Sequence, residues 1–390
     1  MTTLAADSPL PDPAIFSGCL YSAAPWGHLT GAPICALEHL LALKSHFREV
    51  RLVLCEHGPL EDRACAAGIA TTCLPFEFRG LRQAGPWKFV RNIAFVMRSR
   101  WRYVRSLRRM LLDRPGILHV HSRAAHLPYA LLAGRWAGVP MVVTLHEPWK
   151  DGFEARTEVW LIRRWADQVV FLSQEMRRQY RPYLRDRGAV VYNYLKPAPV
   201  GADSRRDPPV IALPARLGHR KGVDVFLEAC RILRDSGIRF EPWLVGEWNS
   251  DEERRQAYEY TRAHGLETLV RDRGLATDMV PVYAAMDILV LTSRRDPLPR
   301  VVMEAMGQGI PVVATRVDGI PEMVEDGTTG YLVESEDAEG VARKLAQLLA
   351  DGERRRKMGE AGRKRALGLF SPETYVARML NLYREIAGAS

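Results

Sequence analysis

"DILVLTSRRDPLPRVVMEAMGQGIPVVAT", residues 287–315, contains the pattern that decides the fold. Its apolar runs DILVLTS and IPVVAT have the length and composition of buried strands. Between them, RVVMEAMG has the spacing of an amphipathic helix, which the glycines of GQG end. A strand, a helix and a second strand in this order are typical of a parallel α/β sheet.

The same alternation continues along the chain on both sides of this stretch. Residues 196–209, KPAPVGADSRRDPP, interrupt it with proline and charge, as an interdomain linker does. Since 390 residues exceed what one core usually organises, two domains are expected. The predicted strands are 14–20, 50–55, 69–76, 116–121, 140–146 and 167–173, then 209–216, 240–247, 269–274, 286–293, 310–316 and 330–335.

These boundaries predict a disordered tail at 1–13, a Rossmann-like domain at 14–195, the linker at 196–209 and a second Rossmann-like domain at 210–370. A C-terminal helix at 371–390 begins with a Ser-Pro-Glu start signal and can pack back on the first domain.

Composition narrows the class of protein. A hydrophobic fraction of 47% and a charged fraction of 26% are typical of a soluble globular chain. The net charge of +9 suits a phosphorylated ligand, an anionic membrane surface or a nucleic acid. The six cysteines form no C-x-x-C pair, which argues against zinc and for a reducing compartment. The sequence contains neither a signal sequence nor an apolar run of membrane-spanning length, so we expect a cytoplasmic protein. Whether it also binds peripherally to the inner face of the cell membrane is not decided by the sequence.

Ligands of such sheets bind at the carboxyl ends of the strands, so the residues after each strand are the candidates. The amides of Arg300 and Val301 begin the predicted helix and form an anion site suited to phosphate. Asp296 before the helix and Glu304 inside it can accept hydrogen bonds from sugar hydroxyls. The alternative, that Asp296 caps the helix and Glu304 is merely solvated, stays open.

Two cations follow the first strand of the second domain. Arg216 and Lys221 lie in the loop before a predicted helix, where they could neutralise a diphosphate. Loop cations are more often simply solvated, so this pair carries weight only together with the carboxylates.

Three motifs carry a resemblance to a known family. ARLGHRKG at 215–222, LVGEW at 244–248 and DPLPRVVMEAMGQGIPVVATRVDGIPEMVEDGTTGYLV at 296–333 resemble the motifs of the retaining glycosyltransferases of family 4, the glycosyl transferases group 1, in their order and spacing. The resemblance implies the GT-B fold, with two doubly wound Rossmann-like α/β domains facing across a cleft. It also implies retaining transfer from a nucleotide diphosphate sugar to a saccharide or lipid-linked acceptor, in cell-surface polysaccharide or glycolipid assembly, with no cofactor and no metal.

The resemblance implies roles for the residues in these motifs. Arg216 and Lys221 would bind the donor diphosphate, and Glu304 the ribose hydroxyls. Asp296 stands where the family has a glutamate that contacts the transferred sugar, and it is shorter by one methylene group. Arg273 corresponds to the segment near the base.

Two further positions concern backbone rather than side chains. Gly246 matches the glycine of a family strand end. Asp318 stands where the family usually has glycine, which leaves the conformation of that turn in question.

The first domain resembles the family more weakly. GILHVHSRAAHLP at 116–128 matches the strand end that carries an active-site histidine near the donor sugar, which makes His121 the corresponding residue. His146 would line the cleft from the next strand. Gly31 in HLTGAP matches a glycine-rich loop where backbone approaches donor or acceptor.

The segment 88–112 is the most basic part of the chain and has the spacing of an amphipathic helix. An arginine stripe on it could bind an anionic leaflet or could be an ordinary solvated face. Nucleic acid fits less well, because no DNA- or RNA-binding module accompanies the charge. The basic stripe is Arg91, Arg98, Arg102, Arg105 and Arg109, and the opposite apolar stripe is Ile93, Met97, Val104, Leu107 and Leu111.

The sequence leaves two rival functions to compare with glycosyl transfer. A dinucleotide oxidoreductase is disfavoured because G-x-G-x-x-G follows neither first strand. A non-catalytic protein of the same fold that binds sugar nucleotides or membranes remains open, and Asp296 is its one support.

Overall fold

The computed structural model describes residues 16–25, 31–77, 86–121, 125–196 and 207–387, and side chains of residues 86–94 are outside this description. The predicted tail at 1–13 and most of the predicted linker therefore lie outside the described residues. The chain forms two compact units. Unit 1 is Met1–Leu172, Met176–Val191 and Glu373–Ser390, and unit 2 is Ser173–Glu175 and Tyr192–Pro372.

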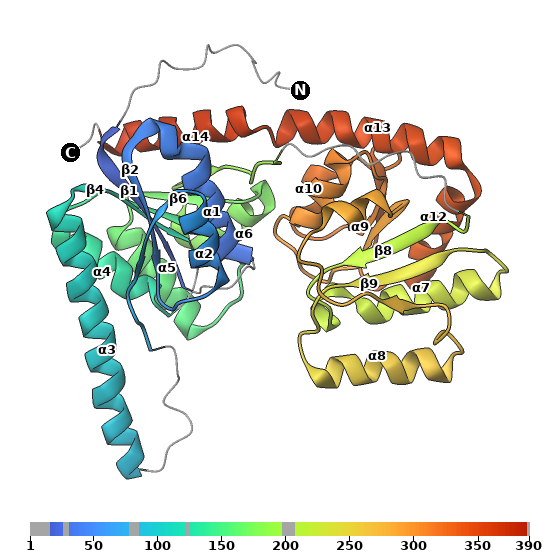
Figure 1. Ribbon diagram of the computed structural model, residues 1–390, viewed down its shortest axis with the longest axis horizontal. Coiled ribbons are helices and arrows are strands. Elements are labelled where there is room, and N and C mark those ends of the chain that lie inside the picture. Colours follow the sequence, from blue (N-terminus) through green and yellow to red (C-terminus); the bar gives the residue numbers. More distant parts are fainter. Residues whose placement is uncertain (1–15, 26–30, 78–85, 122–124, 197–206, 388–390) are drawn as a thin grey trace. The chain divides into compact units, whose positions relative to one another are not determined.

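Unit 1 is built on a parallel sheet of seven strands in the order β3-β2-β1-β4-β5-β6-β7 (Figure 1). Six of these strands were predicted, because buried parallel strands are apolar along their whole length. The seventh has two residues and gives no such signal. The strands are β1 (Phe16–Ala24), β2 (Phe47–Leu54), β3 (Ala70–Cys73), β4 (Gly116–His121), β5 (Met141–Leu145), β6 (Gln168–Phe171) and β7 (Ala189–Val190).

Helices cover this sheet, and the last helix of the chain is one of them. In α14, Met379, Leu380 and Tyr383 are buried in the same apolar core as Leu20 of β1 and Leu40 of α1. The helices are α1 (Gly31–Leu43), α2 (Pro59–Ala66), α3 (Pro86–Asp113), α4 (Leu127–Ala137), α5 (Phe153–Trp165), α6 (Gln174–Leu184) and α14 (Pro372–Ala387), with a short 3₁₀ turn η1 (Lys44–His46).

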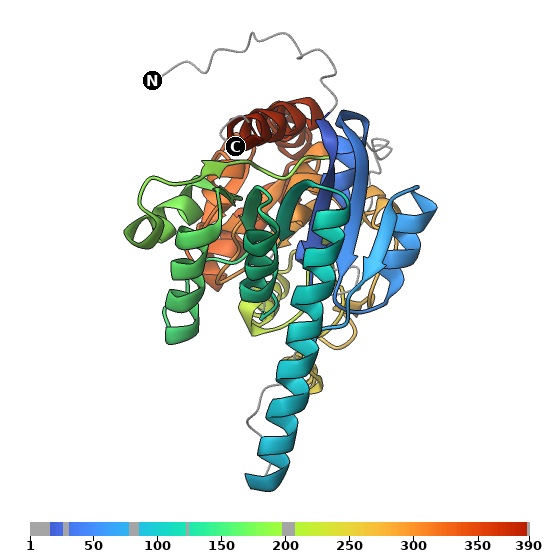
Figure 2. The same cartoon turned by 90° about the vertical axis from the view of Figure 1, so that its left-hand side faces the viewer.

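Helix α3 is the predicted basic helix, and α3, α4 and α5 lie side by side (Figure 2). Val104, Leu107 and Leu111 are fully buried, as the apolar stripe requires. Met97 was expected in that stripe but is 52% exposed. Val96 and Ser99, at the same level of α3, are only 5% and 8% exposed, so the covered face of the helix there does not include Met97. The side chains of Arg91 and Ile93 lie outside the described part.

Unit 2 has a parallel sheet of six strands in the order β10-β9-β8-β11-β12-β13, and all six were predicted. The strands are β8 (Val210–Pro214), β9 (Glu241–Val245), β10 (Arg271–Asp272), β11 (Ile288–Leu291), β12 (Val312–Thr315) and β13 (Gly330–Val333). Its helices are η3 (His219–Lys221), α7 (Val223–Asp235), α8 (Asp251–Ala263), α9 (Val280–Ala284), α10 (Arg300–Gly307), α11 (Ile320–Met323), α12 (Ala338–Ala350) and α13 (Gly352–Leu369).

Both sheets reverse their direction of winding at one place, between β1 and β4 in unit 1 and between β8 and β11 in unit 2. Ligands of doubly wound sheets bind at such a switch point, outside the carboxyl ends of the strands. The described residues at the carboxyl ends of these four strands are therefore the ones that the fold presents to a ligand.

The structure divides the chain a few residues earlier than expected. Tyr192–Leu195 belongs to unit 2, because the Leu195 amide donates to the Phe370 carbonyl at 2.8 Å and the Tyr192 and Phe370 rings are in edge contact. The C-terminal helix belongs to unit 1 from Glu373 onward. Among the described helices, none is both long enough and apolar enough to span a membrane.

Candidate active site

The switch point of unit 2 brings Lys221 and Asp296 together. Lys221 ends the 3₁₀ turn after β8, Asp296 lies in the loop after β11, and β8 and β11 are neighbours in the sheet. The Lys221 ammonium donates to a carboxylate oxygen of Asp296, and the two residues are only 9% and 5% exposed. Both residues were predicted as site residues, but not as an ion pair.

Gly222 and Thr292 explain how the two loops meet. Gly222 has a φ of +66°, and a Cβ there would lie 2.0 Å from the Thr292 carbonyl oxygen. The Thr292 hydroxyl donates to the Gly222 carbonyl at 2.7 Å. Position 222 therefore requires glycine, because its φ is positive and because a side chain there would collide with Thr292 and force the two loops apart.

Asp318 supports the same loop from the turn before α11. Its carboxylate accepts the backbone N–H of Asp296 at 2.8 Å and the Arg295 Nε–H at 3.0 Å. Its φ is +44°, the left-handed region in which aspartate is tolerated better than most residues. The turn therefore keeps a conformation that suits glycine, and the added carboxylate binds the segment that carries Asp296.

Helix α10 begins at Arg300, with Val301 as its second residue, as predicted. Its N-cap is Pro299, with no capping side chain, so the alternative in which Asp296 caps the helix is wrong. Glu304 is not merely solvated either. Its carboxylate accepts the Tyr283 hydroxyl at 2.8 Å and pairs with the Arg300 guanidinium at 3.2 Å.

The remaining predicted residues of unit 2 lie at the ends of neighbouring strands. Arg216 follows β8 and is exposed, and no ion pair is found for it among the described residues. Arg273 follows β10, where its guanidinium lies 4.7 Å from the Trp243 ring centroid. Gly246 follows β9 with a φ of +140°, and a Cβ there would lie 1.8 Å from the Ala215 carbonyl oxygen. Gly246 is thus required by the packing of strand ends.

The switch point of unit 1 carries His121 and Gly31. His121 ends β4 and is 2% exposed, while Gly31 begins α1 with a φ of +41°. The His121 Nδ1 lies 3.2 Å from His146 Nε2, whereas its own Nε2 is buried and has no partner in the described structure. Burial, together with His119, His39 and His146, lowers the pKa of His121 well below its ordinary value.

These contacts define what the His121 ring can do. A neutral imidazole has one donor and one acceptor nitrogen, and His146 engages one of them. The buried Nε2 is left to make one hydrogen bond with a bound molecule, such as a sugar hydroxyl. His146 is neutral as well, because burial lowers its pKa to about 4.

Sequence reasoning missed Tyr283, His119 and His39. Tyr283 holds Glu304 from a five-residue helix, α9, whose pattern gives no warning of that contact. His119 and His121 are two residues apart on a strand, so they share one face of the sheet, and that spacing could have drawn attention to the pair. His39 approaches them from α1, a contact that only the packing of α1 on the sheet creates.

Comparison with family models gives two matches. Residues 30–195 match the model described as glycosyl transferase 4-like domain, and residues 200–365 match glycosyl transferases group 1.

Two curated relatives are similar to long parts of the chain. The lipopolysaccharide core biosynthesis glycosyltransferase LpsE of Rhizobium meliloti is 35% identical over 46% of this chain and 51% of its own. The alpha-maltose-1-phosphate synthase of Mycolicibacterium smegmatis is 30% identical over 69% of this chain and 79% of its own. The match thus spans about half the length of the first relative and most of the second.

The fold is similar to that of solved glycosyltransferases. HepE of Anabaena, crystallised with UDP and glucose, superposes with a TM-score of 0.79 at 19% identity, over 93% of this chain and 98% of its own. Sucrose-phosphate synthase of Thermosynechococcus elongatus superposes with a TM-score of 0.73, also at 19% identity, over 96% of this chain and 100% of its own.

Proposed function

The chain belongs to the group 1 glycosyltransferases of the GT-B fold, and from this premise we propose that it transfers a sugar from a nucleoside diphosphate sugar to a hydroxyl of a saccharide or lipid-linked acceptor, with retention of configuration. The observation that carries the proposal is the buried Lys221–Asp296 pair at the switch point of unit 2. The name of LpsE, a lipopolysaccharide core biosynthesis glycosyltransferase, supports cell-surface polysaccharide or glycolipid assembly as the setting.

In the proposed reaction, the acceptor oxygen bonds to the anomeric carbon as the bond from that carbon to the diphosphate breaks. Lys221, Arg216 and the start of α10 stabilise the charge that develops on the leaving diphosphate. The leaving phosphate oxygen takes the proton of the acceptor hydroxyl, so the reaction needs no side-chain base. Glu304 accepts hydrogen bonds from the ribose, and Asp296 and His121 bind the sugar.

A donor screen tests this proposal. UDP-glucose should be tried first, because HepE has been crystallised with UDP and with UDP-glucose, followed by guanosine and adenosine diphosphate sugars. A donor present at 100 times its Kd should raise the free energy of unfolding by about 2.7 kcal/mol, which a thermal shift detects. Nucleotide release that depends on an acceptor separates an enzyme from a binding protein. Donor binding without any release across a broad acceptor panel would favour the non-catalytic alternative.

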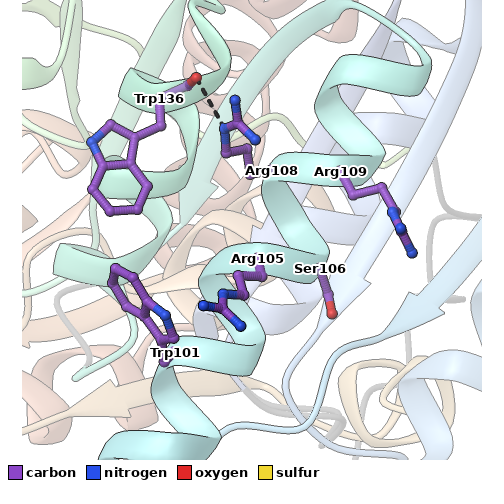
Figure 3. Close-up of a pocket in the computed structure, with 6 residues that line it drawn as sticks. All are labelled: Trp101, Arg105, Ser106, Arg108, Arg109 and Trp136. Carbon is purple, nitrogen blue, oxygen red and sulfur yellow. Dashed lines mark hydrogen bonds between the residues drawn. The ribbon is translucent and has the colours of Figure 1, made fainter.

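We also propose that the exposed face of α3 and α4 contacts an anionic membrane surface. Trp101 of α3 and Trp136 of α4 are 40% and 46% exposed and meet edge to face, with ring centroids 5.3 Å apart. Together with arginines they line a pocket of about 780 Å³ (Figure 3). Arg98, Arg102, Arg105, Arg108 and Arg109 are exposed, and none of these five has an ion-pair partner among the described residues.

This combination suits a lipid headgroup layer. Tryptophan prefers the boundary between apolar and aqueous phases, and each arginine near an anionic leaflet contributes about 1 kcal/mol. Phe95 and Met97 add exposed apolar surface at 59% and 52%. The charge and the aromatic rings therefore favour a membrane over a merely solvated face.

Replacing these five arginines by glutamine should lower binding to phosphatidylglycerol vesicles at least about tenfold, because each lost charge removes part of the attraction. Cosedimentation measures the bound fraction. The control changes five exposed arginines elsewhere, Arg254, Arg255, Arg262, Arg354 and Arg356, to glutamine, so that net charge falls equally. Equal losses in both variants, or no loss in either, would contradict a role for this face.

A further inference from the structure

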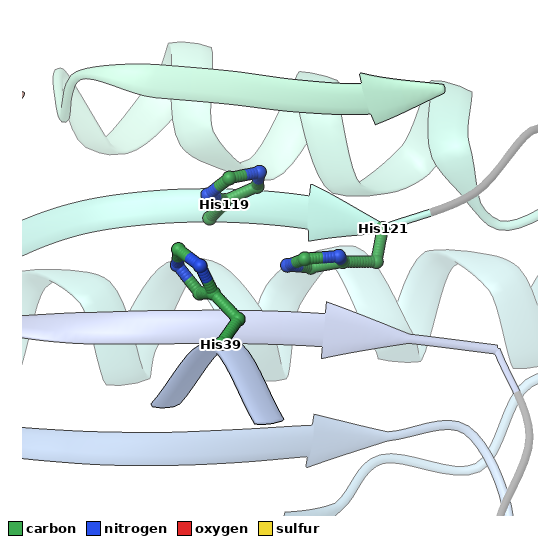
Figure 4. Close-up of side chains that lie close together, drawn as sticks. All are labelled: His39, His119 and His121. Carbon is green, nitrogen blue, oxygen red and sulfur yellow. The ribbon is translucent and has the colours of Figure 1, made fainter. Parts of the chain in front are cut away.

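A buried polar cluster lies under the candidate active-site histidine of unit 1. It joins His39 of α1, His119 of β4, Thr144 of β5 and two tyrosines of α14, Tyr375 and Tyr383. Figure 4 shows His39 reaching from α1 toward the two histidines of β4. His39, His119 and Tyr383 are at most 1% exposed, so their polar atoms depend on one another for hydrogen bonds.

Four hydrogen bonds run through this cluster as one chain. The Tyr375 hydroxyl lies 2.7 Å from His39 Nδ1, and His39 Nε2 lies 2.7 Å from the Tyr383 hydroxyl. The same hydroxyl lies 2.5 Å from His119 Nδ1, and His119 Nε2 lies 2.6 Å from Thr144 Oγ1. Tyr383 is therefore shared between the two histidines.

The protonation of the cluster follows from this geometry. Burial lowers the pKa of His39 to about 3 and that of His119 well below its ordinary value, so each ring carries one proton at neutral pH. Tyr383 has one proton to donate. All four bonds form, and the Tyr383 proton also has an acceptor, only if they run in the same sense, with both rings protonated on Nε2 or both on Nδ1. Any other arrangement leaves a ring nitrogen or the Tyr383 hydroxyl proton without a partner in a buried site, at about 1–3 kcal/mol.

The cluster also contacts the ring of His121. The His119 and His121 rings are stacked, with centroids 4.4 Å apart and planes 18° from parallel, and the His39 ring lies 5.1 Å away. We propose that Tyr383 is a positioning residue, which holds His39 and His119 in matched tautomers and through them orients His121 for the transfer reaction. This inference rests on the proposed function, because it gives α14 a part in that reaction.

A metal site is the competing explanation for three clustered histidines, since suitable ring nitrogens of His39, His119 and His121 lie within 4.8 Å of one another. Every ring nitrogen of His39 and His119, however, already faces a hydroxyl. A metal ion needs a free lone pair from each ring and converging rings, whereas the His119 and His121 rings are nearly parallel. The contacts therefore favour a hydrogen-bonded chain.

Tyr383→Phe tests the proposal, because it removes the shared hydroxyl and keeps the ring. We expect kcat for transfer to fall about tenfold while the Kd of the nucleoside diphosphate alone stays within about twofold, since the ring of His121 is misplaced and the unit 2 residues are untouched. The matched control is Tyr180→Phe, which removes another buried tyrosine hydroxyl of unit 1, one that donates to the Glu147 carbonyl. It should lose comparable stability and leave kcat unchanged.

A second measurement needs no enzyme activity. Side-chain ¹⁵N shifts of His39 and His119 should report the same tautomer in the unchanged protein, and the match should be lost in Tyr383→Phe. If that variant does not fold, Thr144→Val, which removes only the terminal hydroxyl, should shift the His119 signal. Different tautomers in the unchanged protein, an unaltered kcat in folded Tyr383→Phe, or one equivalent of zinc that His39→Ala abolishes would overturn the proposal. Matched tautomers in a protein without transferase activity would instead count against the proposed function alone.

Discussion

Replacing Lys221 by methionine is expected to lower kcat/KM for sugar transfer by about 10³, the range seen when one preorganised charge-stabilising donor is lost. Methionine keeps an apolar stem of similar length and removes the ammonium group. In the proposed reaction the change removes the buried cation that stabilises the leaving diphosphate, and it also leaves the Asp296 carboxylate buried without its Lys221 partner. Acceptor-dependent nucleotide release at several donor concentrations measures the loss.

The second effect must be separated from the first, because an uncompensated buried charge costs about 3–5 kcal/mol and could unfold the site. Adding Asp296→Asn to Lys221→Met removes that charge. We expect the double variant to regain most of the lost stability in urea unfolding and to stay inactive. Recovered activity would mean that Lys221 serves only to neutralise Asp296, and near-normal activity of Lys221→Met alone would refute the assigned site.

The pairing of Lys221 with Asp296 also shows which features of the site could be predicted from the sequence and which could not. Each residue was identified, because each follows an apolar run that is recognisably a strand, and strand ends are where such folds bind ligands. Their contact was not, because it depends on β8 and β11 being neighbours although they are far apart in the chain. A strand order cannot be read from local apolar patterns.

Asp318 illustrates a second limit of prediction from the sequence. It stands where the family motif usually has glycine, so the sequence left the conformation of its turn undecided. In the structure its carboxylate accepts the backbone N–H of Asp296, which is itself a position that differs from the family motif. The effect of Asp296 or of Asp318 cannot be inferred from its own position, because it depends on a contact with a residue that is distant in the sequence.

The cores were easier to predict than the helix surfaces. Val104, Leu107 and Leu111 lie on the expected buried stripe of α3, because residues at this helical spacing share the one face of the helix that packs against the rest of unit 1. Met97 follows the same period, but at its level of the helix the buried residues are Val96 and Ser99, and Met97 is exposed. Arg100, which breaks the apolar stripe, is accommodated between the Phe76 and Tyr129 rings at 5.5 and 5.4 Å, a solution that needs a neighbouring helix and loop.

Replacing Glu304 by glutamine is expected to lower kcat/KM by about 10², mainly through a higher donor KM. Glutamine keeps the size and one acceptor oxygen of glutamate, so it can still receive the Tyr283 hydroxyl or the Arg300 guanidinium. It has no charge, and its NH2 group cannot accept the proton of a ribose hydroxyl as the second carboxylate oxygen can. Hydrogen bonds to charged groups contribute about 1.5–3 kcal/mol, which sets the expected size of the loss.

Tyr283→Phe is the matched control, because it removes one contact of Glu304 and leaves its charge. It should lose much less activity than Glu304→Gln if the carboxylate acts on the donor and not only on Tyr283. A donor lacking the ribose 2′- and 3′-hydroxyls sharpens the test. The unchanged protein should discriminate against this donor by a factor close to the loss in Glu304→Gln, and the variant should hardly discriminate, because the interacting partner is already gone. Full discrimination in the variant would place the ribose elsewhere in unit 2 and leave Glu304 as a residue that orders α9 and α10.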